Sequence, residues 1–125
     1  MKWDEKYSLQ HADMDRTHRE FIDLLDELNN ATGEEFIGLF QALKTHTQHH
    51  FDQELEWMQQ SSFTSTAEHN DDHRRILGEL AQMEKRLRPA TLPLVKAYLA
   101  DRLPQWFELH INTMDSALAA HLNSN

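Results

Sequence analysis

The feature that most constrains this chain is a set of histidine and carboxylate residues that interrupt otherwise apolar helical stripes. In the segment 46–58, apolar residues recur at intervals of three and four, as on one face of an α-helix, yet His50 and Glu54 occupy that face. Residues four apart on a helix differ by about 40° in direction, so these two side chains stack one above the other. A buried histidine bonded to a glutamate would explain this pair alone, but similar interruptions recur along the chain.

The composition predicts an all-α protein. The 125 residues include only three glycines and three prolines, and no stretch alternates polar and β-branched residues as a strand would. A chain of this length suffices for one domain with one core, which we assign to residues 1–125. Four amphipathic stretches predict an up-down-up-down four-helix bundle with an N-terminal extended arm. The arm is expected at residues 1–12 and the helices at about 13–30, 34–60, 66–88 and 92–122.

Local signals suggest how these helices begin. Asp13 is a plausible N-cap of the first helix, and Thr32 with Glu35 matches the capping box of the second. Ser65 with Glu68 matches the same pattern before the third helix.

Two further features concern the arm and the fourth helix. Trp3 and Tyr7 are expected to anchor the arm on the bundle, and Pro104 is expected to kink the fourth helix because it removes one backbone hydrogen bond.

Seven potential metal ligands lie on the inward faces of these four helices. In an up-down bundle they would all fall at one end, because each lies near the start of an ascending helix or toward the end of a descending one. Burying so many polar groups without a cation would cost about 1–3 kcal/mol for each unpartnered group. The predicted metal ligands are His18, His50, Glu54, His69, His73, His110 and Asp115.

The number of ligands favours two metal ions. Seven ligands exceed one tetrahedral site, which takes about four. Two six-coordinate ions that share both carboxylates and an oxygen bridge would keep one position open for a small molecule. Nitrogen and oxygen ligation suits iron, although manganese, cobalt or zinc would also be compatible.

The spacing of His110 and Asp115 predicts a widened turn. Five residues of a regular α-helix rotate about 500°, which would turn Asp115 away from the site. One π-type turn would absorb about 100° of this rotation and bring Leu118 and Leu122 inward, in agreement with the slipped apolar pattern after His110. A regular helix would instead turn Ala117 and His121 toward the core.

Charge and composition limit the other partners. The absence of cysteine excludes disulfides and thiolate metal sites, so histidines and carboxylates are the strong ligands. The formal net charge of −9 disfavours nucleic acid and anionic membrane surfaces. The sequence shows no signal-peptide core and no apolar run of membrane-spanning length, so we expect a cytoplasmic protein. We also expect it to be a monomer.

Taken in order, these motifs resemble those of the hemerythrins, specifically the single-domain bacteriohemerythrins. The resemblance spans nearly the whole chain and includes the 15-residue interval from Glu54 to His69. The matching motifs are Trp3 and Tyr7, Asp15-x-x-His18, His50-Phe51-x-x-Glu54 with Met58, His69-x3-His73, and Trp106-x3-His110-Ile111-x3-Asp115.

The resemblance implies a cofactor of two non-haem iron ions with an oxo or hydroxo bridge, which binds O2 reversibly for storage, delivery or sensing. By that resemblance His69, His73 and His110 would ligate one iron, and His18 and His50 the other, which carries the open position. Glu54 and Asp115 would bridge the two ions.

Some positions depart from the family pattern or lie near the site. Phe107 stands where the family usually has a leucine at the O2 pocket, and we expect Trp106 and Phe107 to line that pocket. His46, one turn before His50, is expected to be half-exposed. The remaining histidines, which we expect to be solvated, are His11, His49 and His121.

Three other functions compete with O2 binding. A di-iron oxidase or peroxidase, or an iron-handling protein, would use similar chemistry, but ferritin-like oxidases use Glu-x-x-His pairs that the inferred ligands lack. A signalling module would normally carry a second domain. We therefore expect an O2-binding protein rather than an enzyme, with at most weak oxidase or peroxidase activity.

Overall fold

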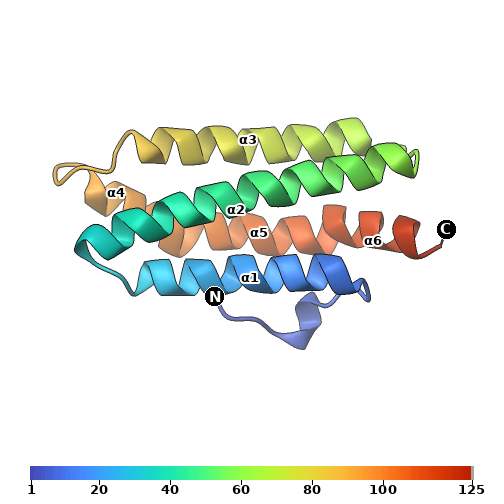
Figure 1. Ribbon diagram of the computed structural model, residues 1–125, viewed down its shortest axis with the longest axis horizontal. Helices are drawn as coiled ribbons and strands as arrows, with labels where there is room; N and C mark the ends of the chain where they lie inside the picture. Colours follow the sequence, from blue (N-terminus) through green and yellow to red (C-terminus); the bar gives the residue numbers. More distant parts are fainter. Residues whose placement is uncertain (125) are drawn as a thin grey trace.

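The fold is a bundle of four antiparallel helical rods, as Figure 1 shows for a computed structural model that describes residues 1–124. Three rods are single helices and the fourth is a continuous run of α-helical and π-helical segments. The first three are α1 (Ala12–Asn29), α2 (Gly33–Gln60) and α3 (Thr66–Glu84). The fourth consists of α4 (Leu92–Ala97), η2 (Tyr98–Arg102), α5 (Leu103–His110), η3 (Ile111–Asp115) and α6 (Ser116–Asn123). The predicted all-α, up-down-up-down bundle is confirmed.

The N-terminal arm lies along α1 (Figure 1) and contains one 3₁₀ turn, η1 (Glu5–Tyr7). Tyr7 is buried in the main core, and the Arg19 guanidinium lies 4.8 Å from the centre of the Trp3 ring. The arm ends at His11, whose Nδ1 accepts a hydrogen bond from the backbone N–H of Met14 at 3.2 Å. His11 is therefore the N-cap of α1, and the expectation that Asp13 caps this helix is wrong.

Two other expected helix ends differ in the structure. Thr32 and Ser65 do precede α2 and α3, but their side chains make no capping hydrogen bond, so the two capping boxes do not form. The third helix ends at Glu84 rather than at residue 88. Residues 85–88 leave the α-helical conformation, because the Arg86 and Leu87 N–H groups bond carbonyls only three residues back. Arg88 also precedes a proline, which disfavours a helical conformation at this residue.

Two apolar clusters enclose the polar residues of the bundle. The larger cluster fills most of the interior and includes Phe21, Phe40, Leu80 and Leu103. The smaller one consists of Met14, Met58, Leu118 and Ala119. On α1, His18 lies between Met14 of the smaller cluster and Phe21 of the larger one. The inward histidines therefore lie between the two clusters and away from bulk water.

The fourth rod contains two π-helical turns, of which one was predicted. In η3 the Ser116 N–H bonds the carbonyl of Ile111, five residues back, and Asp115 is turned into the core. Leu118 is fully buried and Leu122 is half-buried, whereas Ala117 is exposed. The predicted widening between His110 and Asp115 is confirmed.

The second π-turn, η2, lies just before Pro104. Its widened hydrogen bond joins the Leu103 N–H to the carbonyl of Tyr98, also five residues back. Pro104 has no N–H to offer the carbonyl of Ala100, so a regular turn would be incomplete there. The structure thus has a π-turn on the N-terminal side of Pro104, while the kink expected there stays a prediction.

Across residues 1–124, none of the helices combines the length and the apolarity needed to cross a bilayer.

Candidate metal centre

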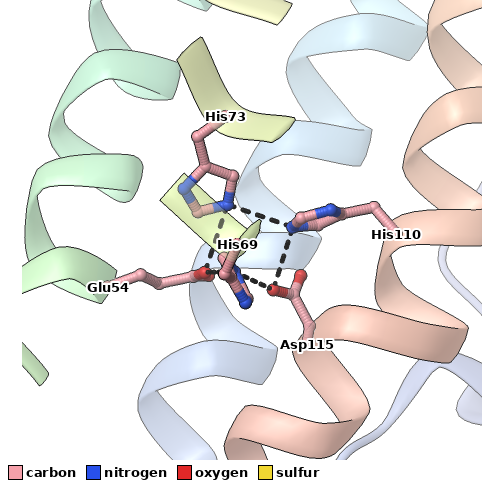
Figure 2. Close-up of side chains that lie close together, drawn as sticks. All are labelled: Glu54, His69, His73, His110 and Asp115. Atoms are coloured by element: carbon pink, nitrogen blue, oxygen red, sulfur yellow. Dashed lines mark hydrogen bonds and ion pairs between the residues drawn. The ribbon is translucent and has the colours of Figure 1, made fainter. Parts of the chain in front are cut away.

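The structure brings all seven predicted ligand residues into one buried cluster. They come from all four rods, and each has at most 5 % of its surface exposed. Figure 2 shows five of them, with Glu54 of α2 facing His69 and His73 of α3 and with His110 and Asp115 of the fourth rod opposite. The ligand atoms of these five lie within 4.8 Å of one another, and those of His18, His50 and Glu54 form a second such group.

Glu54 belongs to both groups because its two oxygens face different histidines. Oε1 lies 2.8 Å from His69 Nε2 and 3.4 Å from His73 Nε2. Oε2 lies 2.5 Å from His50 Nε2 and 3.7 Å from His18 Nε2. The carboxylate thus stands between two sets of imidazole nitrogens.

Asp115 divides its oxygens in the same way. Oδ1 lies 3.1 Å from both His69 Nε2 and His110 Nε2, and Oδ2 lies 3.0 Å from His18 Nε2. The π-turn η3 makes this possible, because it rotates Asp115 beneath His110. Each carboxylate therefore lies between two groups of histidines. We call His69, His73 and His110 the three-histidine group, and His18 and His50 the two-histidine group.

Aromatic rings hold the three-histidine group in place. The Phe51 ring is parallel to the His73 imidazole with the centroids 3.7 Å apart, and the Trp106 ring lies 4.7 Å from that of His110. In addition, Asp72 Oδ2 lies 2.8 Å from His110 Nδ1. Sequence reasoning missed Asp72 because it is off the inward stripe of α3, and its position directly before His73 was the available signal.

Burial and the two carboxylates act in opposite directions on the histidines. Burial favours neutral imidazole, but Asp115 and Glu54 outweigh it and raise the pKa of His18 to about 10 and that of His69 to about 9. Burial, reinforced by the charges of His110 and His69, lowers the pKa of His73 to about 3. Without a cation, the cluster therefore carries protons on His18 and His69 at neutral pH.

The two carboxyl groups remain ionised in this environment. Burial alone would raise the pKa of both, but the nearby histidines outweigh it and hold the pKa of Glu54 and of Asp115 below their ordinary values. Two buried negative charges thus lie among five imidazoles. This is an environment in which bound cations would replace the bound protons.

The carboxylate of Asp115 indicates whether a cation fits this cluster. Among the atoms of residues 1–124, both oxygens of Asp115 are buried and lack a hydrogen-bond partner, although histidine nitrogens lie about 3 Å away. The histidines can pair with this carboxylate by charge, but none is in hydrogen-bonding geometry to it, so a buried Asp115 is incompletely satisfied without a cation. Carboxylate oxygens with imidazole nitrogens are good ligands of iron and similar metals. The residues therefore fit a metal centre.

The two predicted O2-pocket residues contact different histidines of the cluster. The Phe107 ring meets the His18 imidazole edge to face, with the centroids 5.5 Å apart, and packs on Phe21. Trp106 instead covers His110 and donates its Nε1–H to Asp72 at 3.0 Å. Of the two, Phe107 is the residue beside the two-histidine group.

The other histidines are placed as follows. His46 is half-buried, with its Nε2 3.3 Å from Glu20 Oε1, and His49 is exposed. The expectation that His11 and His121 are solvated is wrong. His11 caps α1 and packs on Trp57, and His121 is half-buried with its Nε2 2.9 Å from the carbonyl oxygen of Ser61.

Comparisons with known proteins agree with this architecture. The hemerythrin HHE cation binding domain family matches residues 10–122. The chain is 28 % identical over 122 residues to a protein named bacteriohemerythrin from Ralstonia nicotianae, a match that covers 98 % of this chain and 88 % of the relative. No solved structure gives a significant match. Since the family match includes all seven clustered residues, the chain belongs to the hemerythrin HHE cation-binding domain family.

Proposed function

We propose that this protein binds O2 reversibly at a centre of two non-haem iron ions with an oxo or hydroxo bridge. The observation that carries the proposal is the division of the carboxylate oxygens, since Glu54 and Asp115 each direct one oxygen to each histidine group. A bridging carboxylate needs such a geometry. The family match and the name of the Ralstonia relative support the choice of metal and ligand.

In this proposal each side chain has a defined role. His69, His73 and His110 would hold one ion through their Nε2 atoms, and His18 with His50 would hold the other. Glu54 and Asp115 would each supply one oxygen to each ion and balance the charge of the pair. Two ferrous ions held in this way would supply the electrons for a reversible reaction with O2.

The open coordination position would belong to the ion of the two-histidine group, which has fewer protein ligands. The buried Phe107 and Phe21 rings form an apolar wall beside His18. Such a wall admits an apolar diatomic molecule while it keeps water and anions away from the site. This environment favours reversible binding over turnover.

An oxygenation cycle tests the proposal. The iron-loaded protein is reduced without air, exposed to O2 and then degassed, while its visible absorption spectrum is recorded. We expect a new absorption band that appears with O2 and disappears on degassing over repeated cycles. A change that does not reverse, or steady O2 consumption with a reductant at roughly 10 per second, would indicate an oxidase instead.

A further inference from the structure

Asp72 connects the metal centre to the surface of α3. Its Oδ2 lies 2.8 Å from His110 Nδ1 and accepts the Trp106 Nε1–H at 3.0 Å. The Asp72 side chain is only 16 % exposed, so water competes weakly for these contacts. A carboxylate can only accept here, so Nδ1 of His110 must carry a proton. In the neutral imidazole Nε2 then carries none, and this is the atom that faces Asp115 and the cluster and could bind a metal.

This arrangement distinguishes His110 from the other clustered histidines. Within residues 1–124, the Nδ1 atoms of His18, His50, His69 and His73 are buried without a hydrogen-bond partner. Of the five imidazoles, His110 is thus the one whose outer nitrogen is bonded to a carboxylate.

A cation fixes the orientation of the Asp72 side chain. Arg75, one turn along α3, donates to Oδ1 of Asp72 at 2.6 Å, and it also reaches Glu79 Oε2 at 3.4 Å. Because Arg75 occupies Oδ1, the other oxygen is directed toward the fourth rod. Asp72 Oδ2 thus contacts both the Trp106 indole and the His110 imidazole, and these two rings are stacked on each other.

We propose that Asp72 is a positioning residue, which orients His110 as the Nδ1–H tautomer and strengthens Nε2 as a donor to the metal of the three-histidine group. The inference rests on the proposed function, because it presupposes that His110 is a ligand. A carboxylate on the outer nitrogen of a ligating histidine fixes the ring and makes it more basic. Asp72 would therefore stabilise the ferric state relative to the ferrous state.

Three substitutions separate the possible roles of this side chain. Asp72→Asn keeps the size and an acceptor oxygen but removes the charge, and Asp72→Leu removes both. The matched control is Asp71→Asn, because Asp71 pairs with Arg74 at the same i,i+3 spacing but is 75 % exposed. We expect Asp72→Leu to lower iron affinity about ten- to a hundredfold, Asp72→Asn to lower it less, and Asp71→Asn to leave it unchanged.

Two further measurements report on positioning rather than on folding. In the metal-free protein, the ¹⁵N shifts of the His110 ring should show Nδ1 protonated in the wild type and in Asp72→Asn, and a changed pattern in Asp72→Leu. In the iron-loaded protein, Asp72→Asn should raise the reduction potential, because a neutral amide supports the ferric state less well. Circular dichroism shows whether each variant is folded.

His110→Ala separates failure of this inference from failure of the proposed function. If His110→Ala loses iron while both Asp72 variants match the wild type in affinity, potential and ring shifts, the role of Asp72 is refuted and the metal centre stands. If His110→Ala binds iron as the wild type does, the proposed ligand set itself is refuted, and the role of Asp72 with it.

Discussion

The two histidine groups of this bundle are surrounded differently. In the three-histidine group, Phe51 stacks on His73, Trp106 stacks on His110, and Asp72 reaches the outer nitrogen of His110. In the two-histidine group, His18 meets Phe107 edge to face, and its ring lies 5.0 Å from that of His50. The first environment fixes its ligands from outside, as suits an ion that stays fully coordinated. The second offers an apolar wall, as suits an ion that exchanges a small ligand.

The largest effect should come from the carboxylate that joins the two groups. Glu54→Gln replaces an oxygen that faces one histidine group with an amide nitrogen, which is not a ligand, so we expect loss of most iron from both groups. His49→Ala is the control because His49 is exposed on the same helix. The iron content of the purified proteins measures the effect, and equal contents would show that Glu54 does not bridge the groups.

Removal of one ligand from each histidine group should show that the two groups contribute differently to iron binding and to the O2 response. We expect His18→Ala to keep about half of the iron and to lose the O2 response, because the three-histidine group with both carboxylates remains intact. His73→Ala removes a ligand that is stacked on Phe51 and should lose more iron than His18→Ala. Iron analysis of the two variants together checks this order, and the reverse order would contradict the assignment of the more fixed group.

The pH dependence of stability should differ between the metal-free and the iron-loaded protein. In the metal-free protein, the raised pKa values of His18 and His69 stabilise the fold fully below about pH 6.5, and this stability is lost as the pH rises through about 9 to 10. The metal-free protein should therefore unfold at lower urea concentration at about pH 9.5 than at about pH 7. His18→Gln should reduce this difference.

With iron bound, protons compete with the metal, so the stability that iron adds should grow as the pH rises from about 5 to 7.5. Urea titrations followed by circular dichroism, with and without iron, measure both trends. Identical pH profiles for the two forms would show that protons and metal do not share these sites.

The smallest effect should come from the apolar wall of the two-histidine group. Phe107→Leu shortens a fully packed side chain, so we expect a stability cost on the order of 1–2 kcal/mol and no change in iron content. The added space beside His18 should make O2 release several-fold faster. Stopped-flow release of O2 measures this, and Ile111→Leu, a buried substitution on the same rod, serves as the packing control. An unchanged release rate would remove Phe107 from the ligand path.

The fold and the cluster could be predicted because metal ligands and core residues obey the same geometric rule. A ligand must point inward, so each of the seven residues occupies a position in an apolar stripe, as His18 does between Met14 and Phe21. The π-turn at Asp115 was predictable for the same reason. Asp115 and Leu118 both fell out of phase by one residue, and a single extra residue in the turn corrects both.

Features that depend on contacts between rods could not be predicted in this way. Asp72 lies off the stripe of α3, and its partners Trp106 and His110 are more than thirty residues away in the chain. The cap of α1 is provided by His11 rather than by a residue type that prefers this position. Helix ends such as Glu84 depend on a few local hydrogen bonds that no periodic pattern records.

On the proposed function, the cluster holds two iron ions in unequal environments, and the ion at His18 and His50 takes the small ligand. Mössbauer spectroscopy of protein loaded with ⁵⁷Fe tests this most directly. We predict ferrous signals from both irons in the reduced protein. On admission of O2 both should change to ferric signals of equal area but different quadrupole splitting, because one iron of the two binds the small ligand, and both should return on degassing. A single iron per chain, a change of oxidation state at only one iron, or two ferric signals that cannot be told apart after oxygenation would contradict this assignment.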